Sequence, residues 1–164
     1  KVHLYNNIVA EEHDVDKDFY IIDPNNENKY FSSSVVKLDD WNTDFVNQKG
    51  TNTTWKQTSV VNVKTANLCK FLDERGITEV DTIVTDCEGY DLTILKTMKP
   101  FIDTKRIEFI ECEVEKNSKP AQYNKINNKE SAFLELLGSN YIEDCRENDS
   151  PLSWTLDVRW RRTF

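Results

Sequence analysis

The stretch of sequence that decides the fold is Val80-Asp81-Thr82-Ile83-Val84-Thr85-Asp86-Cys87-Glu88-Gly89-Tyr90-Asp91-Leu92. Its first six residues are rich in apolar and β-branched side chains, which predicts a strand over 80–85. Gly89 permits a sharp backbone turn, and apolar residues at helical spacing follow it, so a helix is predicted to begin at once. A strand followed directly by a helix is the unit from which parallel α/β sheets are built, and the stretch therefore predicts an α/β fold.

The same alternation of strand and helix extends to both sides of this stretch. Strands are predicted at 60–63 and 107–114, and helices over 65–76, from residue 92 to Pro100, and before Gly138. Residues 141–145 and 154–160 are joined by a short turn-rich segment, which predicts antiparallel neighbours. The expected fold is a Rossmann-like, mostly parallel sheet with helices on both faces and an antiparallel strand at the carboxyl end.

The segment before residue 59 has a different character. Short β-prone runs occupy 2–9 and 19–22, and the second precedes a turn-forming Asp-Pro-Asn-Asn. Residues 42–58 are polar and contain a glycine, which predicts an extended surface loop. We therefore expect one domain, in which 1–58 form a β-rich insertion and loop and 59–164 form the α/β half.

Composition and charge exclude several classes of function. The 164-residue chain has a net charge of −8 and a pI near 4.8, which disfavours a nucleic-acid partner because such binding depends on clustered Lys and Arg. The dense basic group at Arg159, Arg161 and Arg162 is interpreted as a solvated terminal strand. No apolar run approaches the roughly 18 residues of a membrane span, so no membrane partner is expected.

The cysteines indicate a cellular compartment. All four lie in apolar or β-like stretches, and none forms a Cys-x-x-Cys pair; they are Cys69, Cys87, Cys112 and Cys145. Buried free thiols are the favoured interpretation, and these are typical of a reducing compartment such as the cytoplasm.

The candidate site lies where the strand over 80–85 ends. Ligands of open α/β sheets bind outside the carboxyl ends of the strands, which is where Asp86 and Glu88 are expected. Carboxylates there can orient or deprotonate a hydroxyl, or hold a cation, although we assign no metal ligand. The alternative is that both acids cap the following helix. Tyr90 is a second candidate, because its ring either borders a cofactor or substrate pocket or packs in the core.

A family resemblance favours the catalytic alternative. The strand hallmark VDxIxxDxEGxExxxL of the FkbM methyltransferase family is similar to this sequence at Val80-Asp81, Ile83, Asp86, Glu88-Gly89 and Leu92, and a Leu95-Lys96 pair follows. The chain departs from the hallmark at Asp91, where the family has Glu, and at Cys87, which is often Val. Residues 61–65 and 107–113 resemble the flanking strands of the family, and the serine run 32–34 resembles the turn of its insertion.

The resemblance implies a class I methyltransferase fold and S-adenosylmethionine as cofactor. It implies a methyl acceptor that is a small-molecule or sugar hydroxyl. Asp86 and Glu88 are then the catalytic acids, Tyr90 a cofactor-binding residue, and Glu111, the acid of the next strand, a substrate-binding residue.

One expected feature of such enzymes is missing from the sequence. The glycine-rich turn that receives the amino-acid end of the cofactor has no counterpart, since the four glycines lie elsewhere, at Gly50, Gly76, Gly89 and Gly138. We therefore expect a partial domain that lacks the amino-terminal cofactor-binding part, with residues 2–9 as the third strand of the complete sheet. The alternative function is a non-catalytic remnant of such an enzyme that acts as an interaction module.

Overall fold

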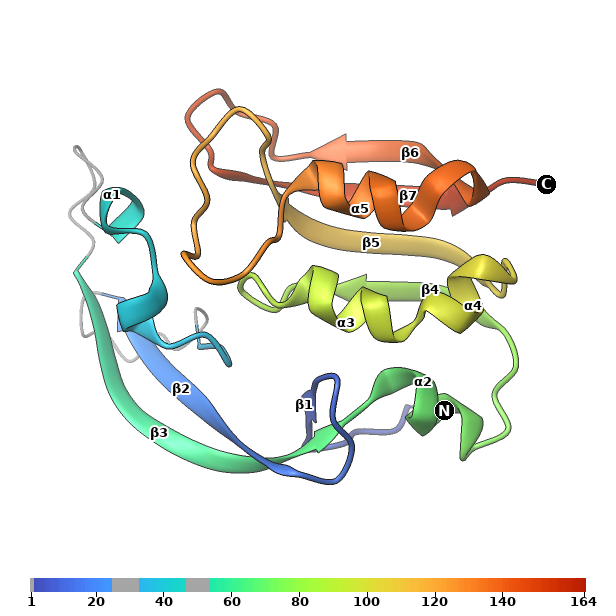
Figure 1. Cartoon of the computed structure of the whole chain (residues 1–164), viewed down its shortest axis with the longest axis horizontal. Helices are drawn as coiled ribbons and strands as arrows, with labels where there is room; N and C mark the ends of the chain where they lie inside the picture. The colour runs from blue at the N-terminus through green and yellow to red at the C-terminus, as the bar shows by residue number, and fades with distance from the viewer. Residues whose placement is uncertain (1, 25–32, 47–53) are drawn as a thin grey trace.

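Two β-sheets form the framework of the protein (Figure 1). The computed structural model describes residues 2–24, 33–46 and 54–164. Its elements in chain order are β1 (Ile8–Val9), β2 (Asp16–Pro24), the 3-10 helix η1 (Leu38–Asp40), α1 (Thr43–Val46), β3 (Trp55–Ala66), α2 (Leu68–Asp73), β4 (Val80–Thr85), α3 (Asp91–Thr97), α4 (Lys99–Asp103), β5 (Ile107–Glu115), α5 (Glu130–Leu137), the 3-10 helix η2 (Gly138–Asn140), β6 (Tyr141–Glu147) and β7 (Thr155–Arg162). The chain is thus a mixed α/β protein, as predicted.

The carboxyl-terminal half forms a four-stranded sheet of order β4-β5-β7-β6. β4 and β5 are parallel, whereas β7 is antiparallel to both β5 and β6. The predictions of a parallel pair and of a reversed carboxyl-terminal strand are therefore confirmed for these strands.

One face of this sheet is covered by helices α3, α4 and α5 (Figure 1). Leu92, Leu95 and Met98 are fully buried there, and the ring of Phe133 stacks on Trp160 at 5.7 Å between centroids. The opposite face carries Val84, which is 65% exposed, and charged side chains. Helices on both faces were predicted, but in the described part of the chain this sheet has its helices on one face.

The other sheet has the order β1-β3-β2 and corrects the prediction for residues 60–63. They belong to the twelve-residue strand β3, which pairs antiparallel with β2 along most of its length and is not a neighbour of β4. The predicted loop over 42–58 is also wrong in part, because residues 43–46 form α1 and 55–58 begin β3; residues 47–53 lie outside the described residues. The mostly polar residues 55–58 form a strand because they pair with β2, which is distant from them in the sequence.

The first strand is shorter than predicted. Only Ile8 and Val9 of the run over 2–9 pair, in parallel, with the end of β3. Val2 and Leu4 are 85% and 92% exposed. Val2 and Leu4 are apolar, but they pack on no other part of the chain that the structure describes, and the strand does not extend to them.

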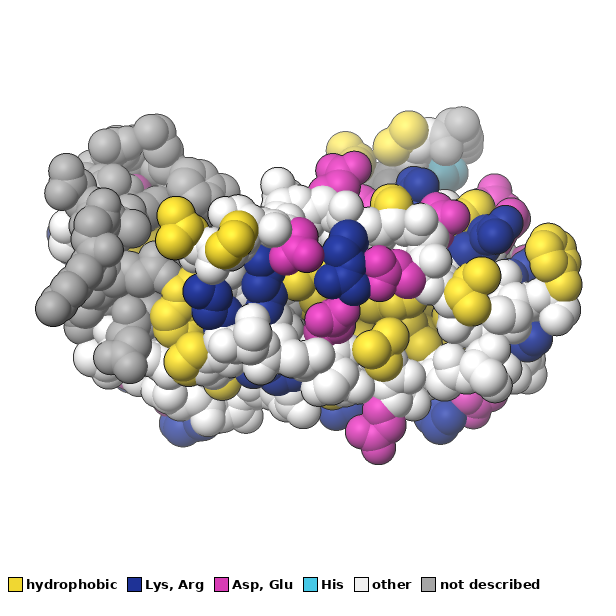
Figure 2. Space-filling model, turned by 90° about the horizontal axis from the view of Figure 1, so that it is seen from above, with side chains coloured by type: hydrophobic (Ala, Val, Ile, Leu, Met, Phe, Trp, Pro, Cys, Tyr) yellow, Lys and Arg dark blue, Asp and Glu magenta, His cyan; other side chains and the backbone are white. Residues whose placement is uncertain are grey.

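Charges of both signs are mixed on the surface. On the face seen in Figure 2, Lys and Arg side chains lie among Asp and Glu side chains. The basic group near the carboxyl end is engaged: Arg159 contacts Asp144 at 3.0 Å, and Arg162 donates to the carbonyl of Lys105 at 3.0 Å. In the part of the chain that the structure describes, every helix is too short or too polar to cross a lipid bilayer.

The four cysteines are free thiols. Cys112 is buried, and Cys69, Cys87 and Cys145 are partly exposed. The prediction of free thiols is confirmed. They were expected to be largely buried, and Cys112 is the cysteine that is buried in the structure.

Candidate functional site

The turn that follows β4 is held by Tyr123, a residue of the distant loop after β5. Glu88 and Gly89 have positive φ angles of 49° and 89°. The Tyr123 ring lies against Gly89, where an added Cβ would be 2.2 Å from the ring atom Cε2. The Tyr123 hydroxyl donates to Glu88 Oε2 at 3.0 Å and accepts a hydrogen bond from Gln122 Nε2 at 2.7 Å. Glu88 is thus anchored, and its side chain holds the turn.

Two further contacts fix the backbone of this turn. Asp91 is fully buried, and its carboxylate accepts a hydrogen bond from the Cys87 N–H at 3.2 Å. Burial raises the pKa of Asp91 to about 6. From the amino-terminal part of the chain, the Ser34 hydroxyl donates to the carbonyl of Glu88 at 3.2 Å. The shape of the turn therefore depends on three separate segments of the chain.

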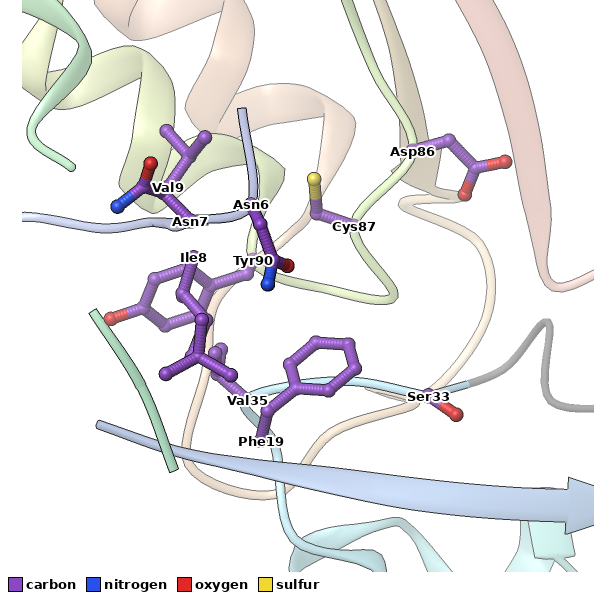
Figure 3. Close-up of a pocket in the computed structure, with 11 residues that line it drawn as sticks. Asn6, Asn7, Ile8, Val9, Phe19, Ser33, Val35, Asp86, Cys87 and Tyr90 are labelled. Atoms are coloured by element: carbon purple, nitrogen blue, oxygen red, sulfur yellow. The ribbon is translucent and has the colours of Figure 1, made fainter. Parts of the chain in front are cut away.

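Asp86 is the exposed acid of the site. It follows the last residue of β4, and Figure 3 shows its carboxylate directed away from the side chains gathered around Tyr90 and Phe19. Partial loss of water raises the pKa of Asp86, and repulsion by Asp157 raises it further. Among the described residues, the structure gives its carboxylate no hydrogen bond and no ion pair. Asp86 can therefore meet a ligand.

A pocket of about 290 Å³ lies beside this turn (Figure 3). All three strands of the β1-β3-β2 sheet contribute to its walls, together with the turn after β4. The residues that line it are Asn6, Asn7, Ile8, Val9, Phe19, Ser33, Val35, Val63, Asp86, Cys87 and Tyr90. The structure thus brings Asp86 and Tyr90, two of the four residues assigned from sequence, to one cavity.

Tyr90 borders this pocket with its ring, while its hydroxyl is engaged by the segment after β1. The hydroxyl donates to Glu11 Oε2 and accepts from Lys17 Nζ at 3.1 Å. Lys17 Nζ also lies 5.3 Å from the centre of the Tyr90 ring and 3.1 Å from Glu12 Oε2. Burial and the bond to Glu11 raise the pKa of Tyr90. Nothing in the sequence pattern predicts Glu11 or Lys17 as its partners.

Glu111 lies apart from the pocket. It is paired with Val84 of β4 and Arg159 of β7 in the sheet register, and Arg159 Nη1 lies 4.0 Å from its Oε2. Glu113, two residues closer to the carboxyl end of β5, is the acid of this strand that reaches the site electrostatically. Burial raises the pKa of Glu113 to about 8, and the charges of Glu88 and Asp86 act in the same direction.

The described residues fit only part of S-adenosylmethionine. The pocket offers the ring of Tyr90 and the amides of Asn6 and Asn7 to a flat polar ring system. No glycine turn faces it in the described part, because Gly76 and Gly138 lie in open space and Gly89 is covered by Tyr123. Within the same residues, no group of three or more His, Cys, Asp or Glu side chains is arranged to hold a metal ion.

Comparison with protein families gives one match. The description "Methyltransferase FkbM domain" matches residues 2–145, which include the turn after β4, the pocket and the β1-β3-β2 sheet. Comparisons with curated proteins and with solved structures find no match. The match covers most of the 164 residues, and the chain therefore belongs to the family of FkbM methyltransferase domains.

Proposed function

We propose that this protein transfers a methyl group from S-adenosylmethionine to a hydroxyl of a small molecule or sugar. Membership of the FkbM family indicates a methyltransferase. The observation that carries the finer proposal is Asp86, an exposed carboxylate beside a pocket at the carboxyl end of β4. Ligands of α/β sheets bind at this end of the strands.

The role proposed for Asp86 is to orient the acceptor hydroxyl and to take its proton. Because its raised pKa makes Asp86 a stronger base than a fully solvated carboxylate, proton transfer to it is easier. Methyl transfer is an in-line displacement, so most of the catalysis comes from positioning. Glu88 and Asp91 serve by fixing the backbone on either side of Gly89.

S-Adenosylmethionine would supply the electrophilic methyl group. Tyr90, at the edge of the pocket, is the described residue that would contact it. Because the fit is partial, we assign no residue to its amino-acid end and derive no step through the cofactor.

The partner and compartment proposals follow from charge and thiol chemistry. A net charge of −8 does not suit a nucleic-acid acceptor. Four free cysteines are compatible with the cytoplasm, where thiols stay reduced.

The proposal is tested on the protein as its gene encodes it, by transfer of tritiated methyl groups from S-adenosylmethionine to a panel of hydroxyl compounds. Asp86→Asn should lower turnover by ~10²-fold, the scale of a positioned acid or base, while folding and cofactor affinity stay nearly unchanged. Asp81→Asn is the matched control, because it removes an exposed carboxylate of the same strand β4 away from the turn, and it should leave turnover unchanged. Full turnover in Asp86→Asn would refute the role of Asp86, and absence of transfer to any compound would favour the non-catalytic interaction module.

A further inference from the structure

The walls of the pocket beside the turn after β4 are apolar. The aliphatic and phenyl side chains among its lining residues are Ile8, Val9, Phe19, Val35 and Val63. Cys87 adds a thiol that stays neutral, because burial raises its pKa to about 12. These walls come from β1, β2, β3 and two loops, so the apolar character is a property of the assembled site.

The polar groups of the lining are mostly engaged elsewhere. Ser33 Oγ accepts the N–H of Ile22 at 3.1 Å, and Asn7 Nδ2 donates to the carbonyl of Lys64 at 3.2 Å. The Tyr90 hydroxyl is bound by Glu11 and Lys17. The polar side-chain groups left for a ligand are the amide of Asn6, the amide oxygen of Asn7 and the carboxylate of Asp86, for which the described residues provide no hydrogen bond. A ligand can therefore satisfy few polar groups of its own here.

Hydrogen bonding selects against carbohydrates in this pocket of about 290 Å³. A sugar has a hydroxyl on nearly every carbon, and each hydroxyl that leaves water without a new partner weakens binding by about an order of magnitude. A compact ring with one hydroxyl loses few such bonds and gains contact with the apolar walls.

We propose that this pocket binds the methyl acceptor, and that the acceptor is a compact apolar ring bearing a hydroxyl. The ring lies against the apolar walls, which include Phe19 and Val63. Figure 3 shows the Asp86 carboxylate directed away from Phe19, so the Asp86 side chain turns toward the pocket to meet the hydroxyl. This assignment rests on the proposed function for the identity of the reaction, and on the lining residues for the chemistry of the ligand. It excludes a polyhydroxylated sugar as the acceptor.

The test uses 2-naphthol, whose fluorescence reports binding, with methyl glucoside as the competing sugar. The purified chain should bind 2-naphthol saturably, and an equal concentration of methyl glucoside should not displace it. Val63→Thr keeps the shape of the side chain but adds a hydroxyl to the pocket wall, and it should weaken 2-naphthol binding about fivefold. Val60→Thr is the matched control on the same strand, since Val60 lies on the opposite face and is 45% exposed.

Each outcome bears on the acceptor class separately from the reaction. Absence of saturable binding, displacement by the glucoside, or equal weakening in Val63→Thr and Val60→Thr would overturn the assignment. The first two outcomes are measured on the unaltered protein, so they remain informative even if a variant fails to fold. Selective binding of 2-naphthol combined with full turnover in Asp86→Asn would keep the pocket assignment and refute the proposed role of Asp86. Methyl transfer to the glucoside with no 2-naphthol binding would refute the acceptor class and keep the proposed methyl transfer.

Discussion

Replacing Gly89 by alanine tests whether the turn after β4 depends on its contact with Tyr123. Gly89 has φ of 89°, in the region that favours glycine. A Cβ at this position would lie 2.2, 2.3 and 2.8 Å from three atoms of the Tyr123 ring. Carbon atoms in contact are separated by about 3.5–4.0 Å, so the ring must move.

The magnitude follows from three contributions. A left-handed backbone costs alanine about 1–2 kcal/mol. Displacing a packed ring adds about 1–3 kcal/mol. The Tyr123 hydroxyl then loses its bonds of 3.0 Å to Glu88 and 2.7 Å to Gln122, at about 1 kcal/mol each. We expect Gly89→Ala to lower the free energy of unfolding by about 4–7 kcal/mol. The expected loss is about 1–2 kcal/mol for Gly138→Ala, whose φ is 53° and whose Cβ would meet nothing within 4 Å.

Urea unfolding followed by tryptophan fluorescence measures both values, because Trp41 lies 5.5 Å from Tyr123 between ring centres. A double-mutant cycle isolates the collision: in a Tyr123→Ala background, Gly89→Ala should cost only about 1–2 kcal/mol, the backbone contribution. Equal losses in Gly89→Ala and Gly138→Ala, or an unchanged loss in the Tyr123→Ala background, would refute the reasoning.

Three further predictions concern single residues. The pKa of Glu113 is raised from 4.5 to about 8, so the folded chain keeps a proton that the unfolded chain releases, and the free energy of unfolding should fall as the pH rises between these values. In Glu113→Gln, the free energy of unfolding measured with urea should depend less on pH over this range. Tyr90→Phe keeps the ring but loses the hydrogen bonds to Glu11 and Lys17, so it should lower the free energy of unfolding by about 1–2 kcal/mol. Its affinity for 2-naphthol should stay within about threefold of that of the unaltered protein, and a larger loss would mean that the hydroxyl faces the ligand. Cys112 is 1% exposed with its pKa well above 9.0, and mass spectrometry after treatment with a thiol reagent should find it unlabelled until urea unfolds the chain; labelling of the native protein would contradict its burial.

Local sequence signals predict the carboxyl-terminal half well. β4 has the predicted bounds, and Gly138 ends α5 with a positive φ as expected of a helix end. The start of α2 is an instructive error. The sequence predicts a helix over 65–76, with Thr65 at its start. Thr65 lies in β3 instead, and the Asn67 side chain accepts the Lys70 N–H at 3.0 Å. Both residues are good caps, and strand pairing decides between them.

The amino-terminal sheet is less predictable because its strands are made by distant pairing. Residues 56–59 of β3 read Lys-Gln-Thr-Ser, which lacks the apolar alternation of a half-buried strand. They are strand because β2 lies alongside, with its register shifted at Ile21 and Ile22. Sequence patterns report burial, and this part of β3 is mostly exposed.

The residues of the candidate site also differ in how well the sequence predicts their positions. Asp86, Glu88 and Tyr90 are placed by one local turn, which the strand and Gly89 predict. Tyr123 comes from a loop with no periodic pattern, and nothing local indicates that it packs on the turn. Glu111 and Glu113 are two positions apart, which is about 7 Å along a strand. The sequence does not determine which of them lies nearer the site.

The hydrogen bonds at the start of helix α3 bear on the capping interpretation of Asp86. Helix α3 has no side-chain hydrogen bond from its N-cap, Tyr90, and the N–H of Leu92 is taken by Asn128 Oδ1 at 3.1 Å. The buried Asp91 binds the Cys87 N–H within the turn. Among the described residues, the Asp86 carboxylate accepts no hydrogen bond from a backbone N–H of the helix. Since Glu88 is held by Tyr123, the exposed carboxylate of Asp86 is the one that the fold leaves for a ligand.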